Sequence, residues 1–274
     1  MSTKENVRRR SRRNAGRAST KTLRRVLSVA LLLGFSGSSI ASAAEVDKDA
    51  KEILRSMSDY LAGVAAFTVD ADIDNEVLDQ QGQKLHLNSS ASLVVQRPGK
   101  LYVHRIGGIA EVELIFDGRT MTLHGLGRNA YMQIDSPGDL DQALQNTRIE
   151  TGLDFPGADL LYSNPYEGLM YGVESGAYLG SGYVNGVECH HLAFRTPEVD
   201  WQIWVQTGDT PLPMKYVITT KWVTAAPQYS VRFRNWNTRP AIDAARFDFS
   251  PKANAKKLKS LPVSPTGELD TEGN

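Results

Sequence analysis

The chain has 274 residues with 31 basic and 31 acidic side chains, so its formal net charge is zero. This length allows one sizeable domain or two small ones. The charge is unevenly spread, because residues 1–25 hold ten Lys or Arg and a single acid. The remaining chain therefore carries 21 basic and 30 acidic residues, a net charge of −9. Such an acidic domain disfavours nucleic acid and anionic membrane surfaces as general partners.

The N-terminal region has the organisation of a secretory signal peptide, which we place at residues 1–43. Its basic part is followed by an apolar run, Val26–Phe35, and by small residues that end in Ala41-Ser42-Ala43. We expect cleavage after about Ala43 and a periplasmic mature protein. The apolar run has about ten residues, against the roughly 20 that span a bilayer, so we expect no integral membrane protein after cleavage. The paired arginines leave the Sec and twin-arginine export routes both open.

Residues 44–251 read as a single domain that begins with a helix and continues as strands. Apolar residues recur every three or four positions over 46–62, which predicts a helix with one apolar face. The period then changes to two, and Phe67, Val69, Ala71 and Ile73 alternate with polar residues. This alternation, interrupted by turn residues such as Asp117-Gly118, predicts six antiparallel strands over 66–134.

The strand pattern stops at residues 139–174, where helical spacing and prolines predict three short helices. This helical insert is either a simple connector or a movable cover whose glycines act as hinges. Alternation returns over 177–236, where Asn185-Gly186 marks a tight hairpin, and it predicts five more strands. Residues 252–274 are polar and charged with few apolar side chains, so we expect a disordered tail.

These elements predict an α+β fold built on a curled antiparallel sheet of about 11 strands. A sheet of that size is expected to curl into a half-open barrel, since a flat open sheet of so many strands is uncommon. The N-terminal helix and the helical insert would then cover its concave face. Such a shape encloses an apolar cavity wherever side chains do not fill the concave face.

Two groups of residues are candidates for chemistry or binding. Cys189 is the only cysteine, so no intrachain disulfide can form, and it shares a predicted strand face with His191. The pair could act as a thiol beside a base, although ordinary packing is the simpler interpretation. No further ligand follows at metal-binding spacing, so we expect neither a metal nor a cofactor. Arg232 and Arg234 share a predicted strand face with Trp236, which makes them candidates for contact with an anionic headgroup or simply an exposed sheet face.

Several stretches resemble known bacterial proteins. RPGKLYVHRIGG at 97–108, followed by FDG at 116–118, is similar to a strand pair of the periplasmic lipoprotein carriers. ADLLYSNPY at 158–166, GYVNGVECHHLAFR at 182–195 and FDFSPKANAKK at 247–257 resemble an uncharacterised family of predicted periplasmic proteins within that LolA/LolB-like superfamily. The resemblance covers about residues 48–258. It implies a half-barrel under a helical lid, in which the carrier relatives hold acyl chains.

We therefore expect a non-enzymatic periplasmic carrier for an apolar ligand such as a lipid or acyl chain. Two alternatives stay open, namely an envelope enzyme that uses Cys189 and His191, and a structural envelope protein that binds a protein partner through an exposed strand edge. The carrier hypothesis predicts that inward-facing apolar side chains line the cavity. Those that we expect to line it are Val69, Leu87, Leu93, Leu114, Ile203 and Ile218.

Overall fold

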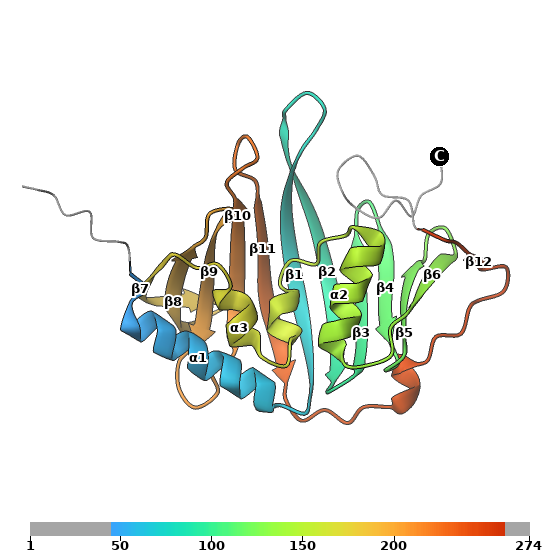
Figure 1. The fold of residues 1–274 in the computed structure, drawn as a ribbon, viewed down its shortest axis with the longest axis horizontal. Helices are drawn as coiled ribbons and strands as arrows, with labels where there is room; N and C mark the ends of the chain where they lie inside the picture. Colours follow the sequence, from blue (N-terminus) through green and yellow to red (C-terminus); the bar gives the residue numbers. More distant parts are fainter. Residues whose placement is uncertain (1–44, 261–274) are drawn as a thin grey trace, which may run out of the picture. The chain divides into compact units, whose positions relative to one another are not determined.

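The computed structural model describes residues 45–260, which form one twelve-stranded sheet with helices packed on one of its faces (Figure 1). The predicted signal peptide, residues 1–43, and residues 261–274 lie outside the described residues. The order of strands across the sheet is β12-β6-β5-β4-β3-β2-β1-β11-β10-β9-β8-β7. The sheet is therefore open, with β7 and β12 at its edges. This confirms the α+β class and the open, largely antiparallel sheet; the structure has twelve strands where the sequence predicted about eleven.

The first half of the sheet is an antiparallel meander of six strands that follow one another in the sequence. Each strand pairs with the next across a short turn, as the alternating pattern predicts. The strands are β1 Ala66–Leu78, β2 Lys84–Gln96, β3 Lys100–Gly107, β4 Glu111–Phe116, β5 Thr120–Gly125 and β6 Ala130–Asp135.

The second half is a meander of five strands that joins the first through pairing of β11 with β1. Ile73 on β1 lies opposite Val231 on β11, so the two predicted strand runs meet in the middle of one sheet. The strands are β7 Ser175–Val184, β8 Val187–Arg195, β9 Val199–Gln206, β10 Pro213–Thr220 and β11 Gln228–Asn237.

The helices lie on one face of this sheet (Figure 1). Helix α1, Lys48–Gly63, begins at Asp47, whose carboxylate accepts a 2.8 Å hydrogen bond from the Asp49 amide. Its apolar face packs against β7, β8 and β9 and is buried at Ala50, Leu54, Met57 and Leu61. The helical insert contains α2 Leu140–Thr151, the 3₁₀ turn η1 Ala158–Leu161, and α3 Pro165–Met170.

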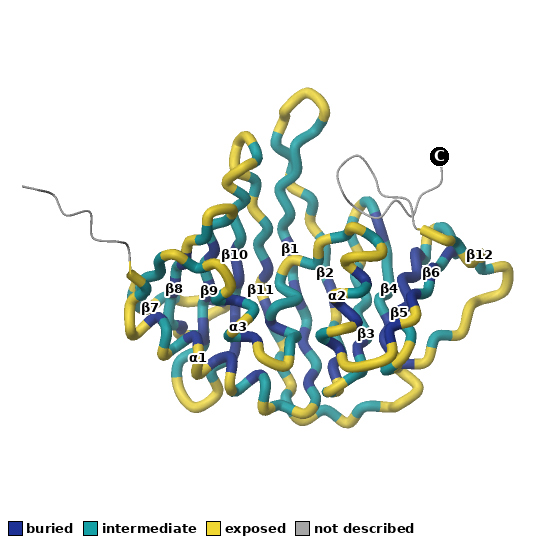
Figure 2. The backbone as a smooth tube through the Cα atoms, in the orientation of Figure 1, coloured by how far each residue is buried: buried dark blue, intermediate teal, exposed yellow. Residues whose placement is uncertain are grey.

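The alternation of strand residues divides the sheet into an inner face, toward the helices, and an outer face. On β1 the odd-numbered residues Phe67, Val69 and Ala71 are buried, whereas Asp70 and Asp72 point outward. Figure 2 shows the buried residues along the central parts of the strands and the exposed ones at the hairpin tips. The hydrophobic core is thus formed by the inner face of the sheet and the helices above it.

The C-terminal segment, residues 238–260, is ordered against the first half of the sheet. Its 3₁₀ turn η2, Ala244–Phe247, buries Phe247 completely. The two residues of β12, Lys256–Lys257, then pair in parallel with β6. The sequence predicted a disordered tail from residue 252, but the amide of Lys256 donates to the Asn129 carbonyl at 2.9 Å. The segment is ordered because the unpaired edge of β6 offers hydrogen-bond partners that make up for its low apolar content.

Candidate functional site: an apolar cavity under the helical insert

A cavity of about 600 Å³ lies between the inner face of β1–β4 and β11 and the segment from α2 to η1. Its walls are mostly apolar side chains, which is the usual character of a small-molecule site. The lining residues include Phe67, Val69, Ala71, Ile73, Leu93, Leu101, Val103, Leu114, Leu144, Leu153, Phe155, Leu160, Leu161, Val231, Phe233 and Trp236.

The cavity exists because small residues occupy the middle of the inner face. Ala71 on β1 and Ala91 on β2 are direct partners across the sheet, and both line the cavity. A pair of alanines leaves unfilled the volume that two larger side chains would occupy at the same positions. Gly157 on the insert also lines the cavity, has φ +87 and carries no side chain. The small side chains of Ala71 and Ala91 therefore leave this part of the cavity unfilled.

A bulge in β11 places Trp236 in this cavity. The sequence predicted Trp236 on the same face as Arg232 and Arg234, and this is wrong. Asn235 has φ 56, and the pairing of β1 with β11 shifts register between Thr68 and Asp70. The extra residue reverses the alternation. The Trp236 ring accordingly lies 5.4 Å from the Phe67 ring on the inner side, and its Nε1 donates to the Pro213 carbonyl at 3.1 Å.

The insert is held over the cavity by two polar contacts with well-defined partners. The Arg97 guanidinium, at the β2–β3 turn, donates a 2.7 Å hydrogen bond to the Leu161 carbonyl. Within the insert, the Asp141 carboxylate accepts hydrogen bonds from the amide of Ser163 at 2.8 Å and from its hydroxyl at 2.6 Å. These contacts fix η1 relative to both the sheet and α2.

The insert also contains a carboxyl group in an apolar environment. Burial raises the pKa of Asp159, and the nearby positive charge of Arg148 only partly opposes that rise. Burial of the neighbouring Tyr162 phenol, together with the charge of Asp159, raises the pKa of that phenol. Burial therefore makes ionisation of Asp159 less favourable than it is in water.

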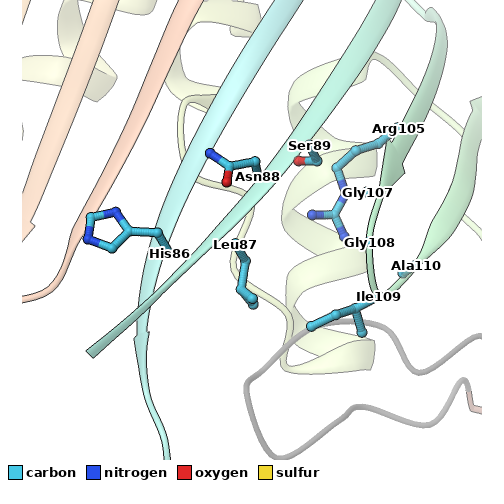
Figure 3. Close-up of a pocket in the computed structure, with 9 residues that line it drawn as sticks. All are labelled: His86, Leu87, Asn88, Ser89, Arg105, Gly107, Gly108, Ile109 and Ala110. Atoms are coloured by element: carbon cyan, nitrogen blue, oxygen red, sulfur yellow. The ribbon is translucent and has the colours of Figure 1, made fainter. Parts of the chain in front are cut away.

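Three of the six residues that were expected to line the cavity lie on its wall, and three lie elsewhere. Val69, Leu93 and Leu114 are on the cavity wall. Leu87 lines a second, smaller pocket (Figure 3). Ile203 has no exposed surface and is packed in the core, while Ile218 is partly buried against that core and outside the cavity wall. Strand alternation identified the correct face of each strand, but the position along the strand decides which side chains are covered by other side chains.

Arg232 and Arg234 lie on the outer face, away from the cavity. The Arg234 guanidinium contacts Asp72 at 2.9 Å and Asp70 at 3.3 Å, and Arg232 contacts Asp74 at 3.5 Å. The hydrogen bond from Arg234, followed by that from Ser90, lowers the pKa of Asp72. Both arginines are thus neutralised by the acidic face of β1.

Cys189 and His191 are on one face, as predicted, but each is engaged in packing. Cys189 is fully buried with Val184 and Met214, and this burial raises the pKa of its thiol. The His191 ring stacks on Trp204 at 4.0 Å, and its Nε2 lies 2.9 Å from the Gln202 side-chain oxygen. A reactive thiol needs a lowered pKa and access to solvent, and Cys189 has neither.

The sequence predicted that the insert covers the concave face, but the six predicted lining residues were all strand residues and included neither an insert side chain nor Arg105. The insert supplies Leu153, Phe155, Leu160 and Leu161. Their apolar character was visible in the sequence, and it predicted packing on the sheet. Which part of the sheet they cover depends on the Arg97–Leu161 contact, which joins residues 64 positions apart.

Among residues 45–260, no cluster of three or more His, Cys, Asp or Glu side chains is arranged to hold a metal ion. In the same part of the chain, no helix has both the length and the apolar character needed to cross a membrane.

The fold and cavity define a class: an open antiparallel sheet with helices over one face and an apolar cavity between the two layers. The chain belongs to the family described as "Predicted periplasmic protein (DUF2092)", whose model matches residues 50–260. The family expected from the sequence is therefore confirmed. No match was found among curated proteins.

Solved structures with similar folds were also found. An uncharacterised conserved protein from Thermus thermophilus is 10% identical, with a TM-score of 0.46 over 77% of this chain and 99% of that one. LprF from Mycobacterium bovis is 12% identical, with a TM-score of 0.45 over 73% and 98%. A LolA superfamily protein from Nitrosomonas europaea is 10% identical, with a TM-score of 0.37 over 73% and 97%.

Proposed function

We propose that this protein is a non-enzymatic periplasmic carrier that binds a lipid or another molecule with an acyl chain in the cavity under the helical insert. The observation that carries the proposal is the cavity itself, about 600 Å³ in volume and lined mostly by apolar side chains. Its volume lies within the range of about 300–1,000 Å³ that is usual for small-molecule sites. The family description as periplasmic agrees with a role in the envelope.

The chemistry of the wall selects for an apolar ligand. Each methylene group that moves from water into such a wall contributes about 0.8 kcal/mol. An alkyl chain therefore gains binding energy along its whole length, whereas a polar molecule would lose hydrogen bonds with water and find few partners. Ala71 and Ala91, at the middle of the floor, leave the space that the chain occupies.

The insert is suited to act as a movable cover. Residues 152–157 form part of the cavity wall, and the segment has a glycine with positive φ at each end, Gly152 at +67 and Gly157 at +87. Glycine permits large changes of backbone angle at little cost. Movement of this segment would open the cavity while the sheet stays unchanged.

Native mass spectrometry of the protein purified from the bacterial envelope tests the proposal. We expect a population with the mass of the protein plus one lipid or fatty acid, which organic extraction converts to the bare mass. A protein that carries no such ligand, and that binds no added fatty acid or single-chain lipid after extraction, would contradict the proposal.

A further inference from the structure

The two edges of the sheet differ in how far the chain itself covers them. At one edge, the C-terminal segment pairs with β6 as β12. At the other edge, β7 pairs with β8 on one side (Figure 1). Among residues 45–260, the only pairing on its other side is a single bridge from Val46 to Gly176, because the chain turns into α1 at Lys48. The rest of β7, residues 177–184, is therefore an open strand edge.

The open side of β7 presents backbone hydrogen-bonding groups. In an antiparallel strand, every second residue directs its amide and carbonyl away from the neighbouring strand. The Gly176 carbonyl does so, since it accepts a 2.9 Å hydrogen bond from the Asp47 amide. At the other end, Val184 closes the two-residue hairpin with β8 and bonds to it, so the alternation directs the backbone groups of Ser181 and Tyr183 to the open side. Both residues are exposed, which leaves these groups accessible to another strand.

β7 lacks most of the features that protect edge strands from pairing with another chain. Such strands are usually short or carry charged residues and prolines. β7 has ten residues, SGAYLGSGYV, with no charged side chain and no proline, and Leu179 and Tyr183 are 54% and 72% exposed. A bulge at Gly180, with φ +97, interrupts the edge. The regular stretch that remains, residues 181–184, suits a short partner segment.

The charges around this edge indicate the chemistry of a partner. Glu174 directly precedes β7, Glu188 lies opposite Tyr183 on β8, and both acidic side chains are exposed. Arg195, also on β8, is paired with Asp200 at 2.8 Å. Basic residues on a partner segment would therefore be attracted to the ends of the edge. A second copy of this chain fits less well, because its own β7 would bring the same two acidic residues to the junction.

We infer that β7 is a docking edge for an extended segment of another protein, which adds one strand to the sheet beside residues 181–184. The segment has apolar or uncharged side chains in its middle and basic residues at its ends. In this mode of recognition the main-chain hydrogen bonds supply affinity and the side chains supply specificity. The inference goes beyond the proposed function, because no residue of β7 lies on the wall of the apolar cavity.

Fluorescence anisotropy with a labelled synthetic peptide tests the inference. The probe alternates valine and threonine and ends in a lysine pair on each side. Its first control has the same side chains but N-methyl groups on all its central amides, which removes the backbone donors. Its second control carries glutamate in place of lysine. We expect the wild-type protein to bind the probe at least about tenfold more tightly than it binds either control.

Substitutions in β7 connect the binding to this edge. Tyr183→Lys places a positive charge beside the open edge and should weaken probe binding about tenfold. Tyr171→Lys is the matched control, since Tyr171 is 87% exposed and lies outside β7, and it should bind the probe as the wild type does. Ser181→Pro removes an outward amide and should have the same effect as Tyr183→Lys. Circular dichroism establishes that each variant folds.

Three results would overturn the inference. The first is equal binding of the probe and the methylated peptide, or wild-type affinity for the probe in folded Tyr183→Lys. The second is the absence of probe binding by the wild-type protein. The third comes from sedimentation velocity, since a wild-type dimer that Tyr183→Lys dissociates would assign the edge to a second copy of the chain instead.

Discussion

Arg97 and Leu161 join the helical insert to the sheet: the Arg97 Nη1 donates a 2.7 Å hydrogen bond to the Leu161 carbonyl. The Nε and Nη2 of Arg97 are buried and have no hydrogen-bond partner among the described residues. Burial accordingly lowers the pKa of the Arg97 guanidinium. The only hydrogen bond of the Arg97 guanidinium among the described residues is therefore with the Leu161 carbonyl, in the insert that covers the cavity.

Replacement of Arg97 by Met should loosen the insert. The substitution keeps the apolar stem and removes a charged hydrogen bond, so we expect a loss of about 1.5–3 kcal/mol in unfolding free energy. Urea denaturation measures the loss. Bound ligand should also exchange faster, as followed by stopped-flow displacement. Unchanged exchange kinetics in this variant would show that the contact does not restrain the cover.

The Asp159 carboxyl should contribute less to the stability of the fold at neutral pH than at acidic pH. Because burial raises its folded-state pKa, the protonated form is favoured by folding. The contribution of this residue to stability is complete below the unfolded pKa of about 3.9 and is lost as pH rises through the folded pKa.

Asp159→Asn should therefore raise the unfolding free energy at pH 7 by more than the roughly 0.5 kcal/mol typical of surface substitutions. The gain should disappear as the pH falls toward about 3.9. Asp154→Asn is the control, because its side chain is exposed and only its surface pair with Arg148 is lost. Chemical denaturation of both variants across this pH range supplies the comparison, and a gain that is independent of pH would refute the explanation.

Cys189 should resist modification in the folded protein. Burial raises the pKa of its thiol, so the thiolate fraction at any given pH is smaller than for a free cysteine. We expect iodoacetamide to label the folded protein at pH 8 roughly a hundredfold more slowly than the denatured protein. Comparable rates in the two states would reopen the hypothesis of a reactive cysteine.

Phe247 should anchor the C-terminal segment. Its side chain is fully buried, and Phe247→Ala should lower the unfolding free energy by about 3–5 kcal/mol. Tyr171→Ala provides the matched control, since Tyr171 is 87% exposed and its loss should change stability by less than about 0.5 kcal/mol. Thermal denaturation distinguishes the two, and similar midpoints for both variants would mean that the segment is not part of the folded core.

The positions of individual helices and strands could be predicted from the sequence better than the contacts between them. Alternation identified β1 from Phe67, Val69, Ala71 and Ile73, and the insert was expected at nearly its observed place. Periodicity predicts which face a residue occupies within one regular element. It does not predict a β-bulge, which reverses the alternation. The positive φ of Asn235 marks such a bulge, and it moved Trp236 to the inner face.

The cavity wall could be predicted only in part for a related reason. Val69, Leu93 and Leu114 were identified by alternation alone, because their strands lie in the middle of the sheet. Ile203 has the same pattern but lies under α1, where packing leaves no space. The difference arises from long-range contacts between helix and sheet, which period and composition do not encode.

Filling the cavity tests the central claim most directly. Ala91→Phe places a ring in the middle of the cavity floor, whereas Ser92→Phe places the same ring on the exposed outer face one residue further along β2. Circular dichroism establishes that both variants fold, since overpacking at Ala91 is expected to cost about 1–3 kcal/mol. Native mass spectrometry after addition of palmitate should then show one bound ligand for wild type and Ser92→Phe, and at least about tenfold weaker binding for Ala91→Phe. Equal palmitate binding by a folded Ala91→Phe protein would contradict the account.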